Sequence, residues 1–225
     1  MSLTIAFDVY GTLIDTAGVV TALEELIGDR SRTFSDLWRS KQLEYSYRRG
    51  LMQNYRDFSV CTAQALDFCC AALQVQINER DRAALLAGYR VLPAFADTGP
   101  ALAALQDRGC RCFAFSNGKP DDVHNLLEQA GLLSSLTGVI STDEIKSFKP
   151  NPAVYAHFLR RSQAAATSAW LVSGNPFDVI GAISAGLQGA WVRRAAEAVF
   201  DPWEIQPTVI VEDLVQLCDV LIPRQ

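Results

Sequence analysis

The sequence predicts an α/β protein, a doubly wound parallel sheet with a helical domain inserted after its first strand. From residue 95 onward, short and almost continuously apolar runs alternate with helix-like segments, which is typical of a buried parallel sheet with helices on both faces. One more apolar run lies alone near the N-terminus, and residues 16–94 contain no convincing strand. We therefore expect a discontinuous core, residues 1–15 and 95–225, and a helical insert, residues 16–94.

The first strand is expected at residues 3–8, because this apolar run is short and Gly11 breaks it with a turn. In the insert, apolar residues recur at helical spacing among polar ones, which predicts four helices; examples are Leu37, Leu43, Tyr47 and Leu51. Pro93 ends the insert. Five further strands are expected at residues 110–115, 138–141, 169–173, 189–193 and 208–211. A helix is expected before each of the first four of these strands, at 99–107, 121–130, 152–162 and 178–185, and another after the last strand.

Composition excludes several function classes. The net charge is −5 and no basic tract is present, so nucleic acid and anionic membranes are not expected partners. No stretch approaches the ~20 apolar residues that span a bilayer, and the N-terminus lacks the basic region of a signal peptide. The six cysteines form no CxxC pair, and both histidines lie far from them in sequence. Free thiols in a cytoplasmic protein without a zinc site are therefore expected.

Ligands of open parallel sheets bind beyond the carboxyl ends of the strands. Four segments at such positions carry polar side chains: Asp8-Val9-Tyr10-Gly11-Thr12-Leu13, Ser116-Asn117-Gly118, Phe148-Lys149-Pro150 and Ser173-Gly174-Asn175-Pro176-Phe177-Asp178. In order and spacing they resemble the haloacid dehalogenase (HAD) superfamily over the whole core. The resemblance implies a Rossmann-like core and an aspartyl nucleophile, Asp8.

Two positions favour cleavage of a carbon–halogen bond over that of a phosphate ester. Phosphatases of the superfamily carry a second aspartate two residues after the nucleophile, which protonates the departing alkoxide; here the residue is Tyr10. A halide is a weak base and leaves without a proton. In the fourth loop phosphatases usually have an aspartate that helps to hold magnesium, and here it is Asn175, a poorer ligand for a hard cation. We therefore expect no metal and no other cofactor.

The insert points to a narrower family. The segment from Leu37 to Tyr45, with Leu51-Met52 and Tyr55-Arg56-Asp57-Phe58, resembles the cap of the type II L-2-haloacid dehalogenases. That resemblance implies that Arg39 and Asn117 hold the departing halide. It also implies an apolar cradle for the substrate, formed by Tyr10, Leu43, Phe58 and Phe177. A homodimer through the cap is a further expectation from the family.

The mechanism expected from these residues is a two-step hydrolysis of an L-2-haloacid. Asp8 attacks C2 and displaces the halide, which forms an aspartyl ester and inverts C2. Lys149 keeps Asp8 charged, and Thr12 and Ser173 fix its rotamer. Ser116 and backbone N–H groups of the first loop, where a turn enters a helix N-terminus, hold the substrate carboxylate.

Water then attacks the ester carbonyl and releases the D-2-hydroxy acid. Asp178, oriented by Lys149 and Asn175, is the expected base. Two departures from the family pattern, Ser40 and Gly174, put substrate range and rate in question rather than reaction type. Three alternatives stay open: a magnesium-dependent phosphatase, a non-catalytic receptor for a small anion, and a defluorinase acting on fluoroacetate.

Overall fold

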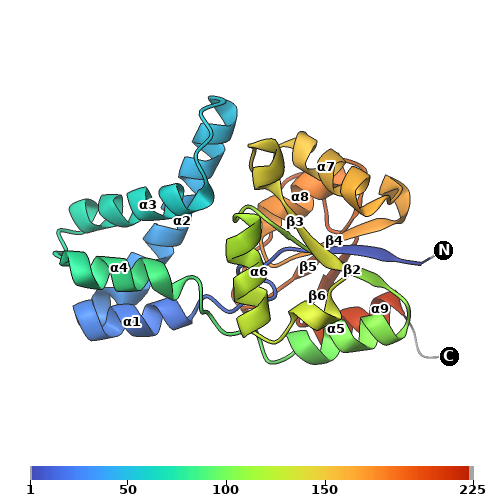
Figure 1. Ribbon diagram of the computed structural model, residues 1–225, viewed down its shortest axis with the longest axis horizontal. Helices are drawn as coiled ribbons and strands as arrows, with labels where there is room; N and C mark the ends of the chain where they lie inside the picture. The colour runs from blue at the N-terminus through green and yellow to red at the C-terminus, as the bar shows by residue number, and fades with distance from the viewer. Residues whose placement is uncertain (1, 223–225) are drawn as a thin grey trace.

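The computed structural model describes residues 2–222 and contains one six-stranded sheet. All neighbouring strands are parallel, in the order β3-β2-β1-β4-β5-β6, which confirms the predicted sheet. The first strand therefore lies at the centre (Figure 1). The strands are β1 (Thr4–Phe7), β2 (Arg111–Ser116), β3 (Gly138–Ser141), β4 (Ala169–Ser173), β5 (Gln188–Val192) and β6 (Val209–Val211).

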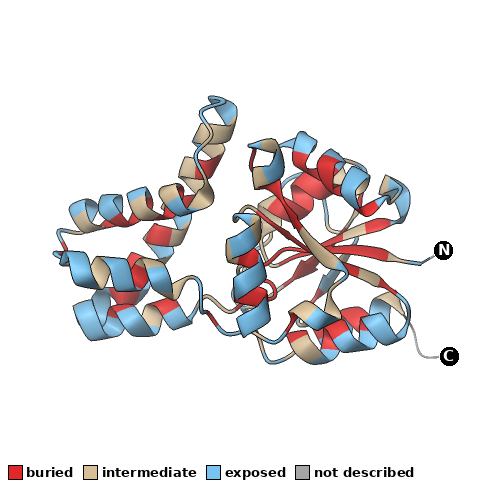
Figure 2. Ribbon diagram, viewed as in Figure 1, coloured by how far each residue is buried: buried red, intermediate tan, exposed pale blue. Residues whose placement is uncertain are grey.

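Helices cover both faces of this sheet, and the side chains of β1 pack alternately against the two helical layers. Ile5 and Phe7 belong to an apolar cluster that includes residues of α5, α6 and α9, whereas Ala6 packs in a second cluster with residues of α7 and α8. Successive strand residues point to opposite faces, so a central strand needs apolar residues at every position. Figure 2 shows the strands of the sheet as largely buried, and every residue of β1 is buried. The core helices are α5 (Thr98–Asp107), α6 (Pro120–Gln129), α7 (Pro152–Ser162), α8 (Pro176–Ser184) and α9 (Leu214–Leu221).

The insert folds as a helical cap beside the sheet (Figure 1). Its helices are α1 (Gly18–Ile27), α2 (Ser31–Leu51), α3 (Phe58–Ala72) and α4 (Glu79–Gly88). Two chain segments join it to the core and bond to each other: Asp15 N donates to Pro93 O at 2.8 Å, and Phe95 N donates to Leu13 O at 3.0 Å. Short 3-10 turns complete the described chain at Gly28–Arg30 (η1), Leu133–Ser135 (η2), Thr142–Ile145 (η3) and Ala166–Ser168 (η4).

The long cap helix α2 contains the helical spacing of Leu37, Leu43, Tyr47 and Leu51 that predicted a helix here. Phe34, Trp38 and Gln42 are buried inside the cap, whereas Leu51 is 87% exposed at the end of the helix. Leu43 is only partly buried and lines a cavity at the core. One face of α2 thus packs inside the cap, and another face lines the cavity at the core.

Two findings concern the described residues as a whole. No helix among residues 2–222 is long and apolar enough to cross a membrane. All six cysteines lie in this range and are free thiols, five of them buried. Burial raises the pKa of the Cys112 thiol to about 12, so this cysteine is a protonated core residue at neutral pH.

Candidate active site

The four polar loops meet at the carboxyl edge of the sheet, around the end of β1. Asp8 follows β1, Ser116 ends β2, Ser173 ends β4, and Lys149 lies in the loop between η3 and α7. Parallel pairing of β1 with both β2 and β4 brings these ends together. The topology therefore places residues that are far apart in the sequence around one carboxylate.

Asp8 is held by donors from three of these loops. Its Oδ1 lies 3.0 Å from Lys149 Nζ. Its Oδ2 accepts hydrogen bonds from Thr12 Oγ1 at 2.9 Å and from Asn175 Nδ2 at 2.7 Å. Ser173 Oγ reaches the same oxygen at only 3.4 Å and accepts a bond from Asn175 N at 3.0 Å. Thr12 and Asn175 thus fix the rotamer of Asp8, and Ser173 mainly shapes the fourth loop.

Lys149 and Asp178 form a buried ion pair behind Asp8. Lys149 Nζ lies 2.7 Å from Asp178 Oδ2 and donates to Phe115 O at 2.8 Å. Burial acts to lower the pKa of Lys149, but the carboxylates of Asp178 and Asp8 outweigh it and raise that pKa. Burial raises the pKa of Asp178 to about 6 against the opposing effect of Lys149, and Asp8 adds to the rise. Asp178 is thus a stronger base than an exposed aspartate and is still ionised at neutral pH.

A small cavity of about 20 Å³ lies in front of Asp8. Its lining includes every residue assigned above to substrate or halide binding: Tyr10, Arg39, Leu43, Phe58, Ser116, Asn117 and Phe177. Arg39 reaches into it from the cap and makes only long contacts, 3.4 Å to Asn175 Oδ1 and 3.5 Å to Gln42 Oε1. A guanidinium held this loosely remains available to an anion.

Asn117 and Ser116 present their remaining donors to this cavity. Asn117 Oδ1 accepts bonds from Lys149 N at 2.9 Å and from Thr142 Oγ1 at 3.1 Å. Its carbonyl end is therefore occupied, and the Nδ2 group is the end available to an anion. Ser116 Oγ accepts a bond from Gly118 N at 3.1 Å, which leaves its hydroxyl proton for a ligand.

A model of the haloacid dehalogenase-like hydrolases matches residues 3–186 of this sequence. The chain belongs to this family. Haloacetate dehalogenase H-2 from Moraxella sp. (strain B) is 36% identical over 190 residues, which cover 84% of this chain and 85% of that protein. The (S)-2-haloacid dehalogenase from Pseudomonas sp. (strain YL) is 33% identical over 216 residues, 93% of each chain.

A solved structure is also similar over its full length. The L-2-haloacid dehalogenase from Xanthobacter autotrophicus with chloropropionic acid covalently bound superposes with a TM-score of 0.91 at 30% identity, and the match covers 100% of both chains. Similarity at this level supports the fold described above.

In this hydrolase the carboxylate of Asp178 is oriented differently from the expectation. Asn175 was expected to orient it, but the Asn175 amide donates instead to Asp8 and, at 3.3 Å, to Tyr10 O. Tyr155 of α7 takes that place and donates to Asp178 Oδ1 at 2.8 Å. Sequence reasoning missed Tyr155 because an aromatic residue within a helix resembles ordinary core. Its buried phenol needed a partner, which is the signal that could have found it.

The expected helix N-terminus at the first loop is also absent from the structure. The N–H groups of residues 11–14 are used within the turn itself, since Thr12, Leu13 and Ile14 donate to Val9 O and Gly11 donates to Ile14 O. No helix begins until Gly18, because the chain leaves the sheet here for the cap. Helix α6 instead begins just after the second loop, at Pro120, and α8 begins within the fourth, at Pro176.

Proposed function

We propose that this chain is a metal-independent (S)-2-haloacid dehalogenase that converts L-2-haloacids to D-2-hydroxy acids and halide. The observation that carries the proposal is the Asp8 carboxylate, fixed by Lys149, Thr12 and Asn175 and facing a cavity with Arg39 on its cap side. The relatives named for haloacetate and (S)-2-haloacid dehalogenation support the same carbon–halogen bond chemistry.

In the first step an oxygen of Asp8 attacks C2 and the halide leaves with the bonding electrons. Arg39 and the Asn117 amide stabilise the charge that develops on the halogen. The Ser116 hydroxyl donates to the substrate carboxylate. The C2 substituent lies in the cradle of Leu43, Phe58, Phe177 and Tyr10, which supplies apolar contacts to it.

In the second step water attacks the carbonyl carbon of the Asp8 ester, and Asp178 accepts the proton. The bond between the Asp8 carbonyl carbon and the C2 oxygen then breaks, and that oxygen takes the proton that Asp178 accepted. The C2–O bond stays intact, so the product keeps the inverted configuration at C2. Asp178 lies behind Lys149 and does not line the cavity. Its raised pKa, about 6, suits a group that must accept a proton at neutral pH and release it again.

The residues present fit a magnesium-dependent phosphatase poorly. A hard cation beside Asp8 would need oxygen ligands, yet the Asn175 amide donates N–H to both Asp8 Oδ2 and Tyr10 O. A phosphatase also needs an acid at position 10. Burial, followed by the charge of Asp122, raises the pKa of Tyr10 to about 12, so this phenol is a weak proton donor to an alkoxide.

The proposal is tested by incubating the protein with L- and D-2-chloropropionate in EDTA and measuring free chloride, with Asp8→Asn as control. We expect chloride from the L-isomer alone and none with the variant. Absence of chloride from both isomers, together with absence of bromide from bromoacetate, would contradict the proposal.

Three other functions are distinguished by related assays. Fluoride release from fluoroacetate at a comparable rate would identify a defluorinase. Phosphate release from esters that requires magnesium would identify a phosphatase. A small-anion receptor would turn over none of these compounds and would incorporate no heavy oxygen from labelled water.

We also propose a cytoplasmic location, which the six free thiols support, and a homodimer through the cap, which rests on the family resemblance alone. Light scattering of the purified protein tests the dimer.

A further inference from the structure

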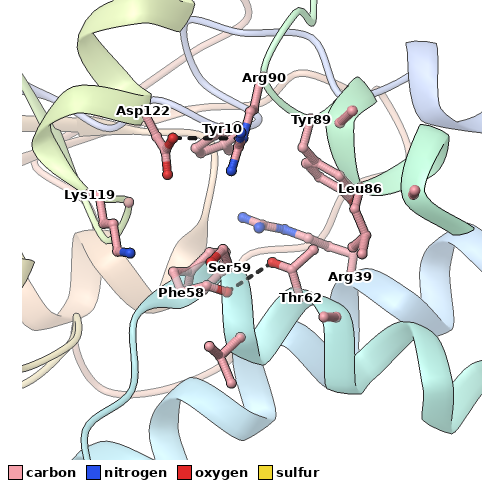
Figure 3. Close-up of a pocket in the computed structure, with 15 residues that line it drawn as sticks. Tyr10, Arg39, Phe58, Ser59, Thr62, Leu86, Tyr89, Arg90, Lys119 and Asp122 are labelled. Carbon is pink, nitrogen blue, oxygen red and sulfur yellow. Dashed lines mark hydrogen bonds and ion pairs between the residues drawn. The ribbon is translucent and has the colours of Figure 1, made fainter.

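A second and much larger cavity, about 460 Å³, adjoins the reaction cavity. Figure 3 shows it between the cap and the loop that leads into α6, with Arg39 projecting into it from the cap. The two cavities share four lining residues: Tyr10, Arg39, Phe58 and Gly118. We call the larger one the side chamber. These shared residues place it next to the apolar cradle at Tyr10 and Phe58.

The wall of the side chamber on the cap side is mostly apolar. Helix α3 contributes Val60 and Ala63, and α4 contributes Ala83, Leu86 and Ala87. Tyr89 closes one end, where its ring lies 6.4 Å from that of Tyr10. An apolar wall with few polar groups is what binds a hydrocarbon group.

Apart from Arg39, which is assigned to the halide in the proposed reaction, the charged residues that line the side chamber already have partners. Arg90 pairs with Asp122 at 3.7 Å, and Lys119 pairs with Asp57 at 3.0 Å. Both pairs join the cap to the core, since Asp57 and Arg90 belong to the cap and Lys119 and Asp122 lie at the start of α6. A second anionic group on the ligand would therefore have to compete with a carboxylate. The chemistry of the chamber favours an uncharged apolar tail.

The reaction cavity itself is too small for such a tail. Its volume of about 20 Å³ is close to that of a single water-sized probe. A C2 substituent longer than a methyl group must leave the cradle, and the shared edge at Tyr10 and Phe58 leads into the side chamber. Gly118 carries no side chain at this junction, where an added Cβ would lie 2.9 Å from Val123 and 3.9 Å from the Tyr10 ring.

We propose that the side chamber binds the C2 chain of the substrate, so that the protein accepts 2-haloacids with an alkyl or aryl tail of several carbons. This inference rests on the dehalogenase function proposed above. Each methylene moved from water into the chamber is worth ~0.8 kcal/mol, which corresponds to about a fourfold rise in kcat/KM per carbon until the chamber is filled. Substrate preference should then increase from 2-chloropropionate to 2-chlorohexanoate.

The test compares the ratio of kcat/KM for L-2-chlorohexanoate and L-2-chloropropionate in the full-length protein and in two variants that fill the chamber, Ala63→Phe and Leu86→Trp. Both variants should lower this ratio about tenfold or more. The matched control is Ala71→Phe, on an exposed position of the same helix as Ala63 but outside the chamber lining, and it should leave the ratio unchanged.

The outcomes separate this inference from the function on which it rests. A wild-type ratio near or below one, or variants that slow both substrates equally, would overturn the inference and make the chamber an access path only. Absence of chloride from 2-chloropropionate with the wild-type protein would overturn the dehalogenase function itself. A ratio that falls in both filling variants but not in Ala71→Phe supports the chamber as a substrate subsite.

Discussion

The phenol of Tyr155 donates to the Asp178 carboxylate and acts to lower its pKa, so Tyr155→Phe should shift the pH dependence of ester hydrolysis. The hydroxyl donates to Asp178 Oδ1 at 2.8 Å, and both side chains are fully buried. A buried hydrogen bond to a charged group is worth ~1.5–3 kcal/mol. At 1.36 kcal/mol per unit, its loss should raise the pKa of Asp178 by about one to two units. The base would then be protonated up to about pH 7 to 8.

The direction of the shift follows because Asp178 must be ionised to accept a proton from water. We expect the acid limb of kcat to move upward, with a loss of about five- to fiftyfold at pH 6 and little loss at pH 9. Rapid-quench measurement should show an undiminished burst of chloride followed by slow turnover, because only the hydrolysis step is affected. Tyr45→Phe, which alters a phenol on the cap helix α2, is the matched control. Superimposable pH profiles for Tyr155→Phe and wild type would refute the reasoning.

Two further substitutions test how the loops are held. In Gly174→Ser the new Cβ would lie 2.3 Å from Gly11 O, so the first loop must shift. We expect a loss of ~1–3 kcal/mol in unfolding free energy and lower chloride release. In Gly99→Ser the new Cβ would meet open space, so neither quantity should change. In Arg194→Met the carboxylate of Asp97 loses its ion pair at 2.7 Å, which should cost ~3 kcal/mol in urea unfolding; an unchanged midpoint would show that this pair contributes nothing to stability.

The sheet and the set of loops around Asp8 could be predicted because each leaves a local signal. Buried parallel strands are short, continuous apolar runs, and polar residues directly after them must converge at one edge of the sheet. Asp8, Ser116, Lys149 and Asn175 were found this way, and the structure brings all four together.

The remaining features depend on tertiary packing that spacing alone does not reveal. Leu51 fits a helical repeat but lies at the exposed end of α2. The N–H groups of the first loop bond within a turn because the chain continues into the cap, which a strand–loop–helix pattern does not anticipate. The side chamber is formed by α3, α4 and the start of α6 together. The sequence shows Gly174 only as a departure from the family pattern. The structure shows that the close approach of Gly11 leaves no room for a side chain at this position.

The most direct test of the central claim, that Asp8 is a covalent nucleophile, is a turnover experiment in heavy-oxygen water. After many turnovers of L-2-chloropropionate, mass spectrometry of the digested protein should find heavy oxygen in the peptide that contains Asp8. In a single turnover the released lactate should contain ordinary oxygen derived from the Asp8 carboxylate. Heavy oxygen in the lactate of a single turnover, with none in the Asp8 peptide, would show direct attack by water on C2 and contradict the mechanism.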